Sequence, residues 1–285
     1  MARGAQRRIA RSTQLSASYV VLILVGCVVS LPVVWLLITS LKTEVEYMAY
    51  PIRIFPAIPQ WDNYVKVFTF GRFSYLGVAR NTLFLALSSS ILTLITSSMA
   101  GFAFSRLRAP GRDKLFLVVI ATLIVPTIVT IIPQFMVFAR LGLTNTYWPW
   151  VLWGLMGSPF HIFLFRQFFA SFPRELEDAA EVDGCGPFRT FWRIFMPNAK
   201  PAIATSFIFA FGGVWGDYFT PLIFLTDAQT TLAVKLSRAY ADPMGNRLIT
   251  ITLAATVVYV IPLVTLFFLG QKHILKGVVR TGLKG

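Results

Sequence analysis

The chain has 285 residues and a mass of 31.9 kDa; 56% of its residues are apolar, 13% are charged, and its mean hydropathy is +0.68. Soluble domains contain about 25% charged residues, so about half of the usual solvating charge is absent. A chain of this length has too much surface for its volume to hide so many apolar side chains from water. These values exclude a soluble enzyme, a secreted disulfide-rich domain and a disordered chain, and they indicate an integral membrane protein.

Six apolar stretches along the chain are long enough to be membrane-spanning helices. The first one, residues 19–41, would reach about 35 Å at about 1.5 Å per residue, which suffices for a hydrocarbon core of about 30 Å. The stretches are too long and too helix-like for the strands of a membrane barrel. We therefore expect an all-α integral membrane protein in a single domain, residues 1–285. The expected spans are Tyr19–Leu41, Asn81–Phe104, Leu115–Ala139, Tyr147–Phe169, Pro201–Leu225 and Leu248–Gly270.

The basic residues predict the orientation. The formal net charge is +14, and most Lys and Arg residues lie in the two terminal segments and in the loops after the second and fourth spans. The positive-inside rule places these segments in the cytoplasm, so both termini are expected there and the charge needs no nucleic-acid partner. The Arg-rich start leads into a stretch too long for a signal peptide, so we expect an uncleaved first helix. Cys27 and Cys185 are expected to form neither a disulfide nor a metal site.

Five of the twelve acidic residues lie within residues 175–183, in the loop between the fourth and fifth spans. Ser171 is a candidate N-cap, Pro173 suits a first helical turn, and Gly184 suits a left-handed helix end. The pattern predicts a short helix outside the bilayer. Its Ala179 and Ala180 would form a patch of small residues that another surface can approach closely.

A second short helix is expected from Pro187 onward. Phe188, Phe191, Trp192 and Phe195 are spaced i, i+3, i+4 and i+7, which predicts one apolar stripe along this helix. Such a helix can lie along the membrane interface before the chain enters the fifth span. The two helices together would form a docking platform on the cytoplasmic surface, residues 171–200.

This loop has the spacing of a known motif. Asp178-Ala179-Ala180, three residues, Gly184, nine residues and Ile194-Phe195-Met196-Pro197 resemble the EAA loop of ABC importer permeases, with Asp178 and Met196 as conservative departures. Asn63-Tyr64, the segment from Trp215 to Leu222 and the closing Gly282–Gly285 are similar to the smaller permease subunits of carbohydrate importers such as the maltose importer. The resemblance implies the permease fold of the type I ABC importers, located in the bacterial plasma (inner) membrane.

The resemblance also implies the partners and the coupling residues. Such a permease works with a second permease subunit similar to the larger one of the maltose importer, two cytoplasmic ABC ATPase subunits and an extracytoplasmic sugar-binding protein. The loop helix would dock on an ATPase, and the tail residues Arg280 and Lys284 would also contact the ATPases. The ATPase-coupling residues implied are Glu177, Asp178, Ala179, Ala180, Asp183, Gly184 and Pro197.

The chain is expected to be a non-catalytic subunit for sugar transport. It has no G-x-x-x-x-G-K-[ST] phosphate loop and no HExxH, CxxC or GxSxG motif, so we expect no cofactor or metal on this chain. ATP and Mg would bind the partner ATPase subunits. A membrane enzyme is disfavoured because no cluster of His, Asp and Glu is available at the cytoplasmic face.

Asp217 is the one acidic residue inside an expected span. An intramembrane carboxylate normally faces a bundle interior or a water-filled cavity. Trp215 and Tyr218 flank it, and aromatic faces beside a carboxylate suit a sugar, so these three residues are candidates for the substrate path. Pairing with the partner permease, or a hydrogen bond within the fifth span, is the alternative role for Asp217.

Two other readings of the function stay open. The solute of the same architecture could be glycerol phosphate, a polyol or an amino sugar. An independent secondary transporter would normally carry paired intramembrane charges, whereas only Asp217 is present here.

Overall fold

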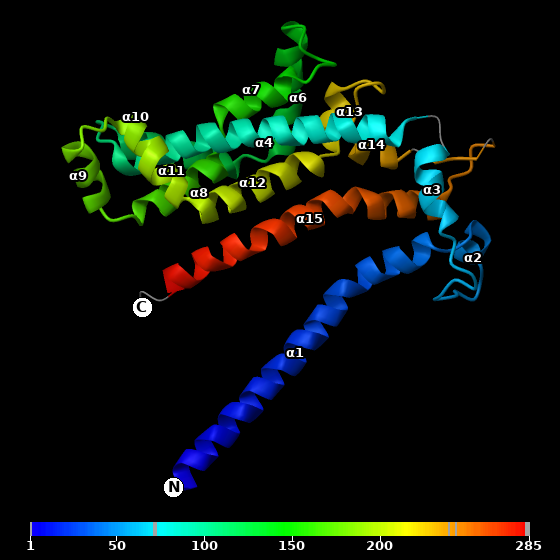
Figure 1. The fold of residues 1–285 in the computed structure, drawn as a ribbon. Helices are drawn as coiled ribbons and strands as arrows, with labels where there is room; N and C mark the ends of the chain where they lie inside the picture. Colours follow the sequence, from blue (N-terminus) through cyan, green and yellow to red (C-terminus); the bar gives the residue numbers. More distant parts are fainter. Residues whose placement is uncertain (1, 71–72, 239, 243, 283–285) are drawn as a thin grey trace. The chain divides into compact units, whose positions relative to one another are not determined.

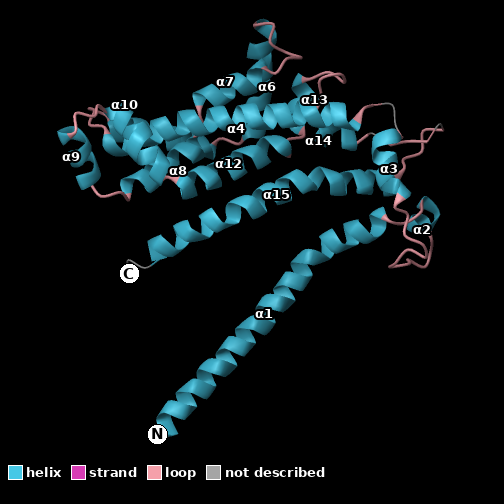
Figure 2. Cartoon of the chain, viewed as in Figure 1, coloured by secondary structure: helices cyan, strands magenta, loops and turns pink. Residues whose placement is uncertain are grey.

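The computed structural model describes residues 2–70, 73–238, 240–242 and 244–282, and this part of the chain is mostly helical, with loops between the helices (Figure 2). It contains no strand; two residues, Ala241 and Arg247, form an isolated antiparallel bridge. The expectation of an all-α fold is confirmed for the described residues.

Three helices are long and apolar enough to cross a membrane. They are Ser18–Ser40 within α1, Tyr75–Arg106 (α4) and Ile249–Lys272 within α15, and they correspond to the first, second and sixth expected spans. Two further pairs of helices meet the same criteria together but are bent, so the described chain has up to five candidate spans if each pair is one span.

The third expected span, Leu115–Ala139, is not one continuous helix. It is divided into α5 with a 3₁₀ turn (Arg112–Ile124) and α6 (Thr127–Arg140), and the two parts meet at 100°. Pro126 explains the break, because it has no N–H to donate and its ring disfavours the helical conformation of the preceding residue. Val125 is accordingly extended, with ψ of 116°.

The fourth and fifth expected spans are also interrupted. Tyr147–Phe169 is divided into α7 (Trp148–Met156) and α8 (Pro159–Ala170) at Gly157, whose φ is +73°. Pro201–Leu225 is divided into α12 (Lys200–Trp215) and α13 (Phe219–Phe224). A transporter can accommodate such breaks where the irregular backbone is covered by protein or faces a cavity.

The chain forms two compact units. The first comprises Met1–Arg72 and Ala239–Tyr259, and its helices are α1 (Ala2–Ser40), α2 (Glu44–Met48), α3 (Asp62–Thr69) and the start of α15 (Ile249–Gly282). Buried Asn63 joins α3 to the end of α1: its amide donates to the carbonyls of Ser40 and Lys42, both at 2.9 Å. This contact gives the Asn63-Tyr64 pair a structural role within the unit.

The second unit comprises Phe73–Arg238 and Val260–Gly285, and α4 is its central helix. Helices α7, α8 and α12 pack against α4 (Figure 1). Gly101 permits α4 and α8 to approach closely: a Cβ built there would lie 2.6 Å from the Phe165 Cβ of α8. The unit also contains α9 (Glu175–Val182), α10 (Pro187–Thr190), a π-helical turn (Phe191–Phe195), α11 (Met196–Asn198) and α14 (Leu232–Leu236).

Candidate functional site

The acidic loop after α8 forms the expected helix, α9, but the helix begins later than predicted. Ser171 is not its N-cap: the Ser171 hydroxyl donates to the Phe168 carbonyl at 2.7 Å and so ends α8. Arg174 occupies the N-cap position of α9 without a side-chain hydrogen bond. Three carboxylates in the first turn, Glu175, Glu177 and Asp178, favour the positive end of the helix dipole instead.

The C-terminal end of α9 has the predicted left-handed residue. Gly184 has a φ of +71°, and its N–H donates to the Glu181 carbonyl at 3.0 Å. The Cys185 N–H donates to the Ala180 carbonyl at 2.8 Å. This pair of bonds is the Schellman motif, in which a glycine lets the chain leave the helix while the last carbonyls stay bonded.

The two faces of α9 differ. Asp178 and Ala179 are exposed, as are Asp183 and Gly184 at its end. Ala180, by contrast, is 2% exposed, so the expected patch of two adjacent alanines is wrong: Ala179 alone lies on the outer surface. The outer face therefore combines carboxylates with one small side chain.

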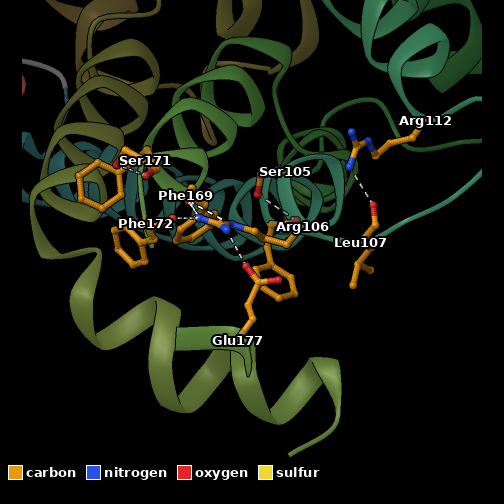
Figure 3. A network of polar contacts seen from close by, with 10 residues as sticks. Ser105, Arg106, Leu107, Arg112, Phe169, Ser171, Phe172 and Glu177 are labelled. Atoms are coloured by element: carbon orange, nitrogen blue, oxygen red, sulfur yellow. Dashed lines mark hydrogen bonds and ion pairs between the residues drawn. The ribbon is translucent and has the colours of Figure 1, made fainter. Parts of the chain in front are cut away.

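Glu177 lies on the inner side of α9, where Arg106 contacts it. Arg106 is the last residue of α4, and one of its guanidinium nitrogens lies 2.6 Å from a carboxylate oxygen of Glu177. The same guanidinium donates to the Phe172 carbonyl at 2.6 Å and to the Phe169 carbonyl at the end of α8. Figure 3 shows Arg106 extending from α4 to the Glu177 carboxylate and to the Phe169 and Phe172 carbonyls.

The second short helix contributes aromatic rings to the same place. Phe191 and Phe195 are 2% and 0% exposed and pack against Phe102 of α4 and Phe169 of α8. The expected single apolar stripe is therefore wrong. Phe188 and Trp192 are exposed at 66% and 39%, because the helix turns π-helical at Phe191–Phe195 and two rings point into the core. The last of the expected coupling residues, Pro197, is exposed in α11.

Asp217 lies in the break between α12 and α13, not within a continuous span. Its carboxylate accepts a hydrogen bond from the Thr220 N–H at 3.1 Å, as an N-cap residue does. Trp215 is 3% exposed and stacks on Phe211, whereas Asp217 and Tyr218 are half-buried. The structure therefore supplies the local hydrogen bond that was the alternative role for Asp217.

The predicted ATPase contacts of the tail fall on side chains that the structure does not describe. The side chain of Arg280 and the whole of Lys284 lie outside the described residues. Of the three glycines near Asp217, which are Gly212, Gly213 and Gly216, Gly212 alone lies close to a side chain of another helix, Leu263.

A helical membrane protein with broken spans and an exposed acidic helix is the type of architecture that transport subunits use, and comparison with known proteins gives the family. The sequence pattern of the family described as "Binding-protein-dependent transport system inner membrane component" matches residues 93–280. The chain belongs to this family. It is accordingly a non-catalytic, multi-pass permease subunit of an ABC transporter.

Named relatives match almost the whole chain. An arabinooligosaccharides transport system permease protein of Bacillus subtilis (strain 168) is 32% identical over 257 residues, covering 89% of this chain and 90% of the relative. An sn-glycerol-3-phosphate transport system permease protein of Brucella abortus (strain 2308) is 32% identical over 274 residues, covering 92% and 95%.

A solved structure shares the fold. It is the crystal structure of a bacterial ABC transporter involved in the import of the acidic polysaccharide alginate, with a TM-score of 0.77, 21% identity, and coverage of 90% of this chain and 94% of that chain.

Proposed function

We propose that this chain is the permease subunit that moves a carbohydrate inward across the bacterial inner membrane, driven by ATP hydrolysis on partner ATPases. The observation that carries the proposal is the solvent-exposed face of α9. Asp178, Ala179 and Gly184 are exposed there, and Figure 1 shows α9 at one end of the second unit. Carboxylates beside a small side chain suit a close contact with hydrogen-bond donors of another protein.

The proposed topology has six spans with both termini in the cytoplasm. The first, second and sixth spans are the long helices, the third is α5 followed by α6, the fourth is α7 followed by α8, and the fifth is α12 followed by α13. This assignment places Arg106, α9 and both ends of the chain on the side with the excess of basic residues, which the positive-inside rule assigns to the cytoplasm.

The proposed complex contains four further chains. A second, larger permease completes the path, two ABC ATPase subunits bind ATP and Mg, and an extracytoplasmic sugar-binding protein delivers the solute. Family membership supports this assembly, since the family is defined by binding-protein-dependent transport. Lipid covers much of the remaining apolar surface. For instance, the most apolar part of α1, within Ser18–Ser40, is not buried by any other part of the described chain.

A carbohydrate is the proposed solute because several relatives are named for the transport of sugars. Asp217 and Tyr218 at the α12–α13 break supply a carboxylate and an aromatic ring, which suit hydroxyl groups. Glycerol phosphate is the second candidate, since one relative with 32% identity is a glycerol-3-phosphate permease. A phosphate close to the Asp217 carboxylate would be repelled, which favours the neutral sugar.

Photo-crosslinking from two matched positions tests the coupling proposal. A benzoylphenylalanine at position 179 lies on the outer face of α9, and one at position 50 replaces exposed Tyr50 in the first unit, which the proposed topology places outside the cell. Position 179 should crosslink to a chain that carries a phosphate-loop ATPase sequence, whereas position 50 should not. Equal labelling from both positions, or no ATPase at position 179, would contradict the proposal.

The solute is tested on the purified complex in proteoliposomes. Arabinooligosaccharide, lactose and glycerol 3-phosphate are added separately with the binding protein, and ATP-dependent uptake is measured. The proposal expects uptake of a sugar; uptake of glycerol 3-phosphate alone would replace the sugar by the second candidate.

A further inference from the structure

Arg106 is the most constrained charged residue near the exposed acidic helix. Its side chain is 7% exposed. It has three kinds of contact: the Glu177 carboxylate, the Phe169 and Phe172 carbonyls, and the face of the Phe195 ring, whose centroid lies 5.2 Å from the guanidinium carbon. Each contact reaches a different part of the chain, namely α9, the end of α8 and the π-helical turn.

Helix α9 is otherwise weakly attached. Loops precede and follow it (Figure 1). Among the residues that the structure describes, the Arg106–Glu177 ion pair is the one side-chain polar contact between α9 and another helix. Buried Ala180 adds an apolar contact, but its side chain is a single methyl group. A displacement of α9 therefore passes to the rest of the unit through Arg106 and through the two loops that flank the helix.

We propose that Arg106 is the positioning residue that transmits movement of α9 to α4 and α8 together. This inference rests on the proposed docking of α9 on an ATPase. The guanidinium is suited to the task because its planar fork donates in several directions at once and keeps its charge, whereas a lysine ammonium is a point charge on a flexible stem. Arg106 thus joins the C-terminal ends of two core helices to the docking helix.

The contacts predict a loss of coupling more than a loss of folding. Glu177 is 31% exposed and can be solvated when its partner is removed, and its helix lies outside the packed core. The aromatic cluster of Phe102, Phe169, Phe191 and Phe195 would still join α4, α8 and the π-helical turn. Without the ion pair, α9 would follow the ATPase while α4 and α8 stay behind.

The number of solute molecules transported per ATP hydrolysed, measured in proteoliposomes, tests this inference. Arg106→Gln should lower that ratio about fivefold or more, which is the usual lower range for energetic coupling between sites, while the complex still assembles and hydrolyses ATP. Arg106→Lys should be intermediate. The matched control is Arg108→Gln, which removes an exposed arginine two residues along and should leave the ratio unchanged.

A double-mutant cycle separates the pair from general damage. Glu177→Gln should lower the ratio less than Arg106→Gln, because the amide still accepts a hydrogen bond, and the double variant should match Arg106→Gln alone. Additive effects, or a normal ratio in Arg106→Gln, would overturn the inference. If Arg106→Gln is not recovered from the membrane, Glu177→Gln decides: a normal ratio in that variant overturns it.

The same experiment distinguishes this inference from the proposed function. If the wild-type chain retains no ATPase and shows no ATP-dependent uptake, the proposed function fails. If the wild-type chain couples normally and Arg106→Gln couples equally well, the role of Arg106 alone fails.

Discussion

Two carboxylates in the second unit satisfy their hydrogen-bonding needs in different ways. Glu177 pairs with Arg106 on another helix, whereas Asp217 accepts from the N–H of Thr220, three residues along its own chain. The long-range pair fixes two helices relative to each other. The local bond fixes only the start of α13. Substitutions that disturb the first contact should therefore alter communication between elements, and those that disturb the second should act locally.

The largest effect is expected from disturbing the packing of α4 against α8, on which the Arg106 contacts depend. A Cβ at Gly101 would lie 2.6 Å from the Phe165 Cβ and 2.9 Å from the Arg166 backbone nitrogen, both on α8. Gly101→Val should push α8 from α4 and cost about 1–3 kcal/mol, as overpacking typically does. Thermal unfolding of the purified chain in detergent should occur about 5 °C lower.

The control for this variant is Gly213→Ala. Gly213 is also a helical glycine, but a Cβ there has no atom within 4 Å. Alanine in place of glycine favours a helix by about 1 kcal/mol, so the melting temperature should stay equal or rise. A wild-type melting temperature for Gly101→Val would show that α4 and α8 do not approach as closely as described.

The sequence predicts helix α9 better than it predicts the long-range pair of Arg106 and Glu177. Helix α9 and its left-handed end at Gly184 follow from local signals, namely acidic residues in a first turn and a glycine after the last turn. The docking motif is also a matter of spacing along the chain. The helix and its end involve residues within one or two turns of each other, and the motif is a fixed spacing along the chain, so both can be read from the sequence.

Arg106 could not be found in the same way. From the sequence it is one of several basic residues at the end of a span, where the topology already explains it. Its pairing with Glu177 depends on how α4 packs beside α8, and that packing depends on Gly101 and on rings such as Phe165. The burial of Phe191 and Phe195 is likewise tertiary, since their spacing also fits a helix lying on a membrane surface.

The sequence partly indicates the breaks in the spans. Pro126 and Gly157 are residues that interrupt helices, but membrane helices often tolerate proline through a mild kink. Hydropathy alone gives no angle, so the 100° bend at Val125–Pro126 could not be predicted.

The second-largest effect is expected at the C-terminal end of α9, the helix whose Glu177 pairs with Arg106. Gly184→Val would force a β-branched residue into φ of +71°, which costs about 1–2 kcal/mol, and it should unwind the last turn around Ala180. We expect several-fold lower retention of the ATPase in pull-downs. Gly184→Asn should retain more, because asparagine tolerates this conformation.

Gly186→Val is the matched control for added bulk. Gly186 has φ of −71° and ψ of 166°, which valine readily adopts, and it has open space around it. If Gly186→Val reduced ATPase retention as much as Gly184→Val, bulk on the loop would be the cause, and the left-handed cap would not matter for docking.

The third prediction concerns the locally bonded carboxylate. Asp217→Asn keeps an acceptor for the Thr220 N–H, whereas Asp217→Leu removes it and should cost about 1 kcal/mol at the start of α13. If Asp217 also contacts the solute, the leucine variant should lose uptake while the yield of the complex changes little. Full uptake with normal yield in Asp217→Leu would leave Asp217 without a role in the path or in assembly.

The smallest effect is expected at a third carboxylate, Glu46 in the first unit, which has local partners only. The N–H groups of Thr43 and Ala57 donate to Glu46 at 3.0 and 2.9 Å, and these bonds hold the pKa of Glu46 below its ordinary value of 4.5. A carboxylate with a lowered pKa stabilises the fold above its ordinary pKa, and the contribution is lost as the pH falls through the lowered value. Amide exchange at Ala57, corrected for the intrinsic pH dependence, should therefore show less protection at acidic pH than at pH 6. Glu46→Leu, which has no acceptor for the Ala57 N–H, should give low protection at both. Protection at Ala57 that is independent of pH in the wild type, or equal in the two chains at pH 6, would mean that the carboxylate does not hold this loop.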